Sequence, residues 1–151
     1  MRLAVPNIIS NISVPLLSTV DTALMGRLSA AHIGAVGLAS MLFNFVYWNF
    51  GFLRMGTTGM TAQAYGSGDG QAIRLVLGRS LLIALTLALL VVLMQQMLLK
   101  AGLLGLQVPE DQVGLVSQYF YIRIWAAPAT LISYALLGWY FGMQNAIYPL
   151  I

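Results

Sequence analysis

The chain has 151 residues, of which 60% are hydrophobic and only 7% are charged, and its mean hydropathy is +0.86. Soluble domains carry roughly 25% charged residues, so this composition cannot cover a water-facing surface. It predicts an all-α integral membrane protein in contact with membrane lipid. Lys and Arg occur singly and the net charge is only +3, which excludes nucleic acid as a partner. The chain has no cysteine and one histidine, so we expect no metal site and no cofactor.

Four segments are long and apolar enough to span a membrane, which takes roughly 20 residues. They cover approximately 3–26, 33–65, 72–99 and 113–143. The third is the clearest, because its run Ser80–Leu99 carries no charge. Short connections predict that consecutive helices are antiparallel neighbours. In the last connection, Pro109 followed by Glu110 and Asp111 is typical of a helix start with acids in its first turn.

The distribution of basic residues favours a cytoplasmic N-terminus. In that orientation the inner side holds Arg2, Arg74 and Arg79, and the outer side holds Arg27 and Lys100. Loops that stay in the cytoplasm carry an excess of Lys and Arg close to the spans. We therefore expect a multi-pass protein of the cytoplasmic (inner) membrane whose N-terminus lies inside.

The first predicted helix carries a stripe of polar side chains that includes one acid. At about 100° per residue these side chains fall within an arc of roughly 120°; they are Asn7, Ser10, Asn11, Ser18, Asp21 and Thr22. Lipid cannot satisfy such a stripe, so it must face protein or water. For the Asn and Ser residues, hydrogen bonding between packed helices is the simpler interpretation.

Asp21 favours a functional interpretation, because a charge at the bilayer centre costs at least ~2.5–3.5 kcal/mol. Partial burial raises the pKa of a carboxyl group, which lets it take up a proton on one side of the membrane and release it on the other. It can equally attract Na⁺ or a cationic substrate. Pro6 and Pro15 each remove a backbone hydrogen bond from the same helix. The resulting bend is either static or changes with the protonation of Asp21.

The other spans offer further candidates with open roles. The glycines of the second span are interpreted as close-packing positions. Asn44 and Asn49 either line a cavity or bridge helices. Arg54 and Arg123 are charges within predicted spans; Arg123 either extends to the outer surface or reaches a carboxylate.

Three motifs in chain order resemble one family of transporters. They are VDTALMGRLSAAHIGAVGLA, GTTGMTAQAYGSGD and GMQNAIYPL. Together they are similar to the multidrug and toxic compound extrusion (MATE) family, and FLRMGTTG is most similar to its DinF-like branch. The resemblance covers the chain from Pro6 to Pro149.

The resemblance implies a secondary antiporter with twelve spans in two six-helix lobes. Such proteins export cationic or amphipathic organic compounds in exchange for H⁺ or Na⁺. The family's first-helix aspartate, held to be central to coupling, corresponds to Asp21, and its helix-bending proline corresponds to Pro6. A cavity tyrosine early in the fourth helix corresponds to Tyr119. With these residues we group Asn7, Asn11, Ser18 and Asn44 as the expected site for the coupling ion and substrate.

The chain is much shorter than the family it resembles. Four predicted spans stand where the family has twelve, so we interpret the chain as part of the N-terminal lobe. Its expected partners are a small organic substrate, membrane lipid and the remaining helices of the full-length transporter. The second lobe, which alternating access requires, is not in this sequence.

Three other functions compete with an antiporter. A flippase for lipid-linked oligosaccharides, from the same superfamily, would favour a strongly cationic cavity. A non-transporting assembly module would use the polar stripe only to hold helices together, so that Asp21→Asn would leave function unchanged. An intramembrane enzyme is disfavoured, because one histidine, no cysteine and four acids provide no plausible pair of catalytic groups.

Overall fold

The computed structural model describes residues 30–145, in which every regular element is a helix. In chain order these are α2 (Ala30–Asn49), α3 (Gly51–Gly66), α4 (Gly70–Leu93), α5 (Gln95–Gly105), α6 (Glu110–Arg123), the 3₁₀ helix η1 (Ile124–Ala126) and α7 (Ala127–Gly142). The all-α prediction is confirmed. Three described stretches are long and apolar enough to cross a membrane: Ile33–Gly66, Gly70–Leu93 and Glu110–Gly142. The first predicted span, 3–26, lies outside the described residues.

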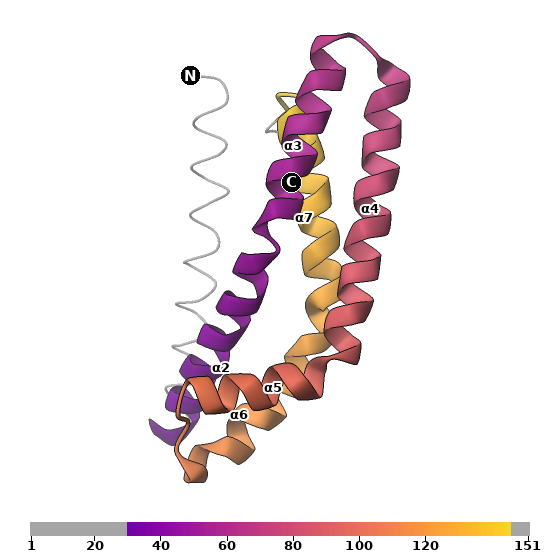
Figure 1. Cartoon of the computed structure of the whole chain (residues 1–151). Helices are drawn as coiled ribbons and strands as arrows, with labels where there is room; N and C mark the ends of the chain where they lie inside the picture. Colours follow the sequence, from indigo (N-terminus) through magenta and orange to yellow (C-terminus); the bar gives the residue numbers. More distant parts are fainter. Residues whose placement is uncertain (1–29, 146–151) are drawn as a thin grey trace.

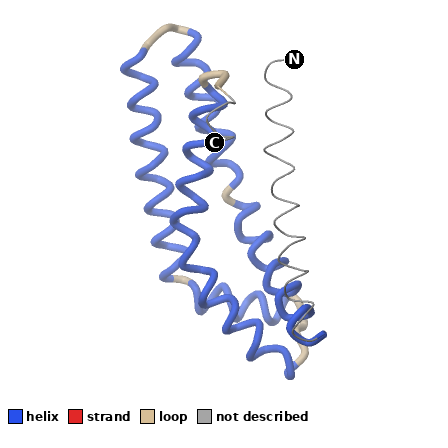
Figure 2. The backbone as a smooth tube through the Cα atoms, turned by 180° about the vertical axis from the view of Figure 1, so that it is seen from behind, coloured by secondary structure: helices blue, strands red, loops and turns tan. Residues whose placement is uncertain are grey.

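The three long stretches pack side by side as an antiparallel bundle. In Figure 1, α2 and α3 run up one side, α4 descends on the other, and α5 crosses the lower end. The chain then returns through α6 and α7, and α7 lies between α3 and α4 (Figure 1). Figure 2 shows from behind that short loops join the long helices at the two ends of the bundle. The main contacts are those of α7 with α3 and α4, of α6 with α2, and of α3 with α4.

Local sequence signals explain where two of the helices start. The Asp69 carboxylate caps α4 by accepting hydrogen bonds from the backbone N–H groups of Gln71, at 3.0 Å, and Ala72, at 2.9 Å. Gly68 precedes it with φ +71°, a conformation that other residues rarely adopt. α6 begins after Pro109 with Glu110 and Asp111 in its first turn, as the sequence predicts.

The last long helix is interrupted by a proline. Pro128 has no N–H, so it cannot donate to the carbonyl of Ile124 four residues earlier. The backbone N–H of Ala127 donates to that carbonyl instead, and the chain winds as the 3₁₀ helix η1 between α6 and α7. The predicted span 113–143 therefore contains two α-helices joined by a tighter turn.

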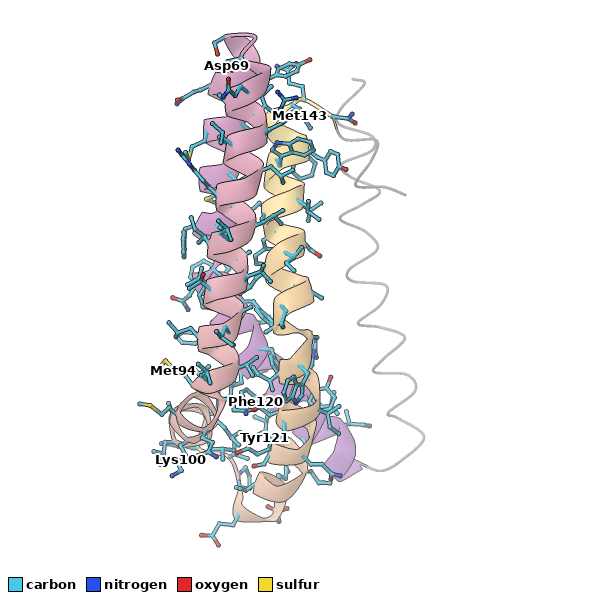
Figure 3. The ribbon with its side chains drawn as sticks, turned by 90° about the vertical axis from the view of Figure 1, so that its right-hand side faces the viewer. Asp69, Met94, Lys100, Phe120, Tyr121 and Met143 are labelled. Carbon is cyan, nitrogen blue, oxygen red and sulfur yellow. The ribbon has the colours of Figure 1, made fainter. Side chains whose placement is uncertain are left out.

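The predicted span 72–99 differs from the structure, because the helix is broken at Met94. α4 ends at Leu93, Met94 leaves the helical region with φ −87° and ψ 8°, and α5 then crosses the end of the bundle. The bend brings Leu99 into the core beside Leu42, where only 5% of its surface stays exposed. Figure 3 labels Met94 at the bend and Lys100 on the crossing helix. Tertiary packing sets this bend, since neither Pro nor Gly occurs at the break.

Small residues form the contact between α7 and its neighbours. α7 buries Leu131, Ala135, Gly138 and Gly142 along one face, and α4 buries Ala84 and Ala88. A Cβ on Gly138 would lie 2.6 Å from the carbonyl oxygen of Arg54, and one on Gly142 would lie 2.5 Å from Cβ of Thr61. Backbones can approach this closely only where side chains are absent.

The glycines of the second predicted span do not provide such contacts among the described residues. No described atom lies within 4 Å of a Cβ built on Gly37, Gly51, Gly56 or Gly59, and Gly34 meets only the side chain of Gln112. For Gly37, Gly51, Gly56 and Gly59, close packing therefore stays a prediction, since the described bundle provides no partner for them. Among the described glycines, those with the tightest contacts are Gly138 and Gly142 on α7 and Gly102 on α5, which faces the side chain of Leu42.

Candidate functional site

The structure describes two of the residues in the expected site. Asn44 lies exposed on α2, and Tyr119 lies half-buried on α6. Asn7, Asn11, Ser18 and Asp21, together with the helix-bending Pro6, lie outside the described residues. The site is therefore built from the helix pair α2 and α6, which pack against each other.

One side of α2 is polar along three successive turns. Ser40, Asn44 and Tyr47 follow at spacings of four and three residues, which places them on the same face of a helix. Ser40 and Tyr47 are half-buried, whereas Asn44 is exposed. Asn44 makes no hydrogen bond to a side chain in the part of the chain that the structure describes. It is thus available to a ligand or to another helix.

Arg123 connects this face of α2 to α6. Its Nη1 donates to the hydroxyl of Tyr119 at 2.7 Å, one helical turn earlier, and to the hydroxyl of Ser40 at 3.3 Å. The guanidinium carbon also lies 5.1 Å from the ring centre of Phe43 and 5.6 Å from that of Tyr119. Both distances are in the range of cation–π attraction. We call Ser40, Phe43, Tyr119 and Arg123 the arginine cluster.

The arginine cluster rests on an aromatic stack. Phe43 is 1% exposed and stacks on Phe120 of α6, with ring centres 5.0 Å apart and ring planes 19° apart. Phe43 also stacks on Tyr47 at 5.8 Å. Figure 3 labels Phe120 and Tyr121 on the same turn of α6. These rings hold one face of the guanidinium in a fixed position.

A second buried hydroxyl continues the polar region toward α7. The hydroxyl of Tyr47 is buried and makes no hydrogen bond of ordinary geometry with a described residue. Its polar neighbours are Thr130 and Tyr134 on α7 and Arg123 on α6. Buried hydroxyls are usually hydrogen-bonded, and the hydroxyl of Thr130 on α7 is the group that can partner this one.

The other intramembrane arginine lies in different surroundings. Arg54 on α3 is half-buried, and its guanidinium carbon lies 5.0 Å from the ring centre of Phe141 on α7. It shares no described contact with the arginine cluster. The two arginines therefore do not form one cationic surface in the described bundle.

The opposite flank of α2 borders an apolar groove. The groove encloses about 590 Å³ between α2, the end of α4 and α5, and its lining includes Met41, Phe45 and Gly102. The amide of Asn49, the polar side chain of this lining, donates to the carbonyl of Phe45 at 2.7 Å in its own helix. Ser40, Phe43, Tyr119 and Arg123 are not part of this lining, so the groove and the arginine cluster are separate features.

Sequence reasoning missed Ser40, Tyr47 and Thr130, and it left the role of Arg123 open. The spacing of four residues between Tyr119 and Arg123 was a usable signal, because such residues meet on one helix face. Ser40 lies 83 residues from Arg123 in the chain, and no local pattern relates them. Arg123 has no carboxylate partner among the described residues, and its extension to the outer surface stays a prediction.

Comparison with known proteins places the chain in a family. The MatE family profile matches residues 6–151. The chain belongs to the MatE family. This confirms the family that the three motifs predicted.

Curated relatives carry names that refer to DNA damage or to multidrug resistance. The chain is 40% identical to "DNA damage-inducible protein F" of Escherichia coli K12, over 99% of this chain and 33% of that protein. It is 37% identical to "Probable multidrug resistance protein NorM" of Bradyrhizobium diazoefficiens, over 59% of this chain and 19% of that protein. A protein of the same name from Synechococcus is 27% identical over 100% of this chain and 33% of its own length.

The chain thus spans about a third of the length of the curated relatives that it matches across its whole extent. No solved structure matches it. The MatE match, together with the three membrane-compatible helices, identifies the described bundle as part of a membrane protein.

Proposed function

We propose that this chain forms part of the N-terminal lobe of an antiporter that exports cationic or amphipathic organic compounds in exchange for H⁺ or Na⁺. Family membership over residues 6–151 is the observation that supports this most directly. The names of the NorM relatives point to multidrug resistance in those proteins. Export needs polar groups inside a membrane bundle, and the face shared by α2 and α6 supplies them.

In this proposal Asp21 carries the exchangeable proton or cation. Asn7, Asn11 and Ser18 share its helix face by sequence, and Asn44 and Tyr119 contribute from α2 and α6. Proton and substrate compete for the one carboxylate, so binding of either releases the other. The N-terminus lies in the cytoplasm, and Pro6 bends the first helix.

The experiment uses the full-length transporter that contains this chain, expressed in cells that lack other efflux pumps. Asp21→Asn removes the ionisable group but keeps the side-chain size. We expect efflux of the cation ethidium, driven by an imposed pH gradient, to fall to the level of cells without the transporter. Unchanged ethidium efflux in this variant would rule out Asp21 as the coupling residue.

Asp69→Asn provides the matched control. Asp69 lies at the end of the bundle in the turn before α4 (Figure 3), where its side chain caps the helix. Asn is an equally good N-cap. The control therefore removes one carboxylate outside the spans, and we expect it to transport ethidium normally.

The flippase alternative predicts a different result. Recognition of a pyrophosphate group favours several converging cations, whereas Arg54 and Arg123 contact different helices and different aromatic rings. A flippase would also leave ethidium efflux at background in the unmodified protein. The same assay therefore discriminates between the two functions.

A further inference from the structure

The helices of the bundle are interrupted at three places. The first break is at Phe50, between α2 and α3, and the second is at Met94, between α4 and α5. Both residues have the same backbone conformation outside the helical region, with φ −89° and ψ 4° at Phe50 and φ −87° and ψ 8° at Met94. The third break is η1, and a 3₁₀ turn inside a long helix often marks a hinge.

The three breaks surround one core cluster. This cluster contains Val46, one turn before the first break, Val91 and Leu99 on the two sides of the second, and Ile124 in the third. The ring of Phe50 packs against this cluster and also against the cluster that α3, α4 and α7 form. The breaks are therefore neighbours in space, although they lie far apart in the sequence.

Helix packing divides the described bundle into two parts at these breaks. α3, α4 and α7 pack against one another, and α6 packs against α2 and α5. The main contacts between the two parts join helices that follow each other in the chain, or they reach η1. In Figure 1, α5 and α6 lie at the lower end, and α3, α4 and α7 extend away from them side by side. We call these groups the α2–α5–α6 part and the α3–α4–α7 part.

The apolar groove lies where a movement between the two parts needs space. Protein interiors are close-packed, so two packed parts can turn against each other only where there is room. The groove encloses about 590 Å³, and its lining comes from both parts, since α2 and α5 contribute to it together with the end of α4. Phe50 and Met94 belong to this lining. A turn at these two residues that brings α2 toward α4 would therefore narrow the groove.

We propose that Phe50, Met94 and η1 form a hinge, about which the α2–α5–α6 part turns as a unit against the α3–α4–α7 part while the groove narrows. Hinges are commonly a few residues at the ends of helices, which absorb the change in φ and ψ. The glycine contacts between α3 and α7 and the ring stack between α2 and α6 each lie within one part, so the movement preserves them. The arginine cluster moves with the α2–α5–α6 part.

This inference goes beyond the proposed function, because it concerns a movement of the fold and requires no particular substrate or coupling ion. It is tested on the purified full-length transporter in phosphatidylcholine nanodiscs, by measuring distances between pairs of spin labels. The 151 residues contain no cysteine, so labels can be attached to cysteines introduced in pairs. Cysteines elsewhere in the transporter are first replaced by serine.

Three label pairs distinguish movement between the parts from movement within them. Leu82 on α4 with Gln118 on α6 joins the two parts. Leu82 with Met60 lies within the α3–α4–α7 part, and Gly37 with Gln118 lies within the α2–α5–α6 part. All four positions are exposed in the described bundle. Pulsed electron paramagnetic resonance gives the distribution of each distance, and we expect the first distribution to be about twice as broad as the other two.

Two substitutions test the hinge and the groove separately. Pro128→Ala restores a backbone N–H group beside η1, which favours a continuous helix. Gly105→Trp places a large ring at a position in the groove lining where an added Cβ has no described atom within 4 Å. We expect each substitution to narrow the distribution between Leu82 and Gln118 to the width of the other two.

Pro109→Ala and Leu104→Trp are the matched controls. Pro109 precedes α6 and lies outside the three breaks. Leu104 is the neighbour of Gly105 on α5, but it is 80% exposed and does not belong to the groove lining. We expect both control variants to leave all three distance distributions unchanged.

Equal widths for the three label pairs in the unmodified transporter would overturn the proposal. A broad distribution between the parts that neither Pro128→Ala nor Gly105→Trp narrows would also contradict it, because the movement would then depend on other residues. The same holds if the two control variants narrow the distribution as strongly. The measurement uses neither a substrate nor an ion gradient, so its outcome does not depend on whether the transporter is an antiporter.

Discussion

Two helix pairs of the bundle are joined by opposite kinds of contact. α3 and α7 meet where side chains are missing, since Gly138 and Gly142 face the backbone and threonines of α3. α2 and α6 meet through large side chains, with Phe43 stacked on Phe120 and Arg123 bound to Ser40. Lipid offers no hydrophobic drive for helix association, so packing and hydrogen bonds must provide it. The first pair depends on backbone approach and the second on ring stacking and hydrogen bonds between side chains.

Among the substitutions that test this comparison, Gly138→Ala is expected to lower the stability of the protein most. The added methyl group would lie 2.6 Å from the carbonyl oxygen of Arg54, and backbone cannot move aside as a flexible side chain can. We expect a loss of about 1–3 kcal/mol in stability. The measurement is the thermal unfolding midpoint of the detergent-purified protein, followed by tryptophan fluorescence.

Gly56→Ala is the control, because no described atom lies within 4 Å of its Cβ position. At this position alanine is expected to stabilise the helix by about 0.5–1 kcal/mol, because it is less flexible than glycine in the unfolded chain. An unfolding midpoint that falls equally in both variants would show that the contact at Gly138 is not special.

Replacing the stacked ring of Phe43 is expected to have an intermediate effect. Phe43→Leu keeps an apolar side chain but removes the stacking on Phe120, at a cost of about 0.5–1.5 kcal/mol. A double-mutant cycle with Phe120→Leu measures the coupling between the two rings. Phe45→Leu, on a side chain that is 73% exposed, is expected to change stability by less than about 0.5 kcal/mol. Additive effects of Phe43→Leu and Phe120→Leu would contradict the stack.

The smallest expected effect is that of Ser40→Ala. The hydrogen bond from Arg123 is 3.3 Å long, and interhelical bonds in membranes contribute about 0.6 kcal/mol on average. The substitution should have no effect in an Arg123→Gln background. Ser133→Ala is the control, since Ser133 donates only to the carbonyl of Ala129 in its own helix. If Ser40→Ala lowers stability equally in the Arg123→Gln background, the hydrogen bond between the two side chains contributes nothing to stability.

The sequence predicted those parts of the fold that depend on local chemistry. Apolar length indicated the described spans, and the acids after Pro109 marked the start of α6. The break at Met94 was not predictable, because no residue there disfavours a helix and the bend depends on where Leu99 is buried. Likewise, a glycine contact requires knowledge of the facing helix, so the sequence did not predict the contacts of Gly138 and Gly142 with α3.

Prediction of the candidate site was limited in the same way: local spacing could be used, but contacts between distant helices could not be predicted. Tyr119 was identified from the family resemblance, and its bond to Arg123 follows from helical spacing. Ser40 joins them only because α2 and α6 cross at one position. The roles of Asp21, Asn7, Asn11 and Ser18 remain predictions, since those residues lie outside the described part.

The 3₁₀ helix η1 sets the direction in which the arginine cluster points. A 3₁₀ helix turns about 120° per residue and an α-helix about 100°, so three residues of η1 add roughly 60° of rotation between α6 and α7. α7 is fixed against α3 and α4. The added rotation therefore sets how α6 is turned about its own axis relative to α7. Pro128 imposes this winding by lacking one N–H. The direction in which Arg123 leaves the axis of α6 is thus determined by a proline five residues further along the chain.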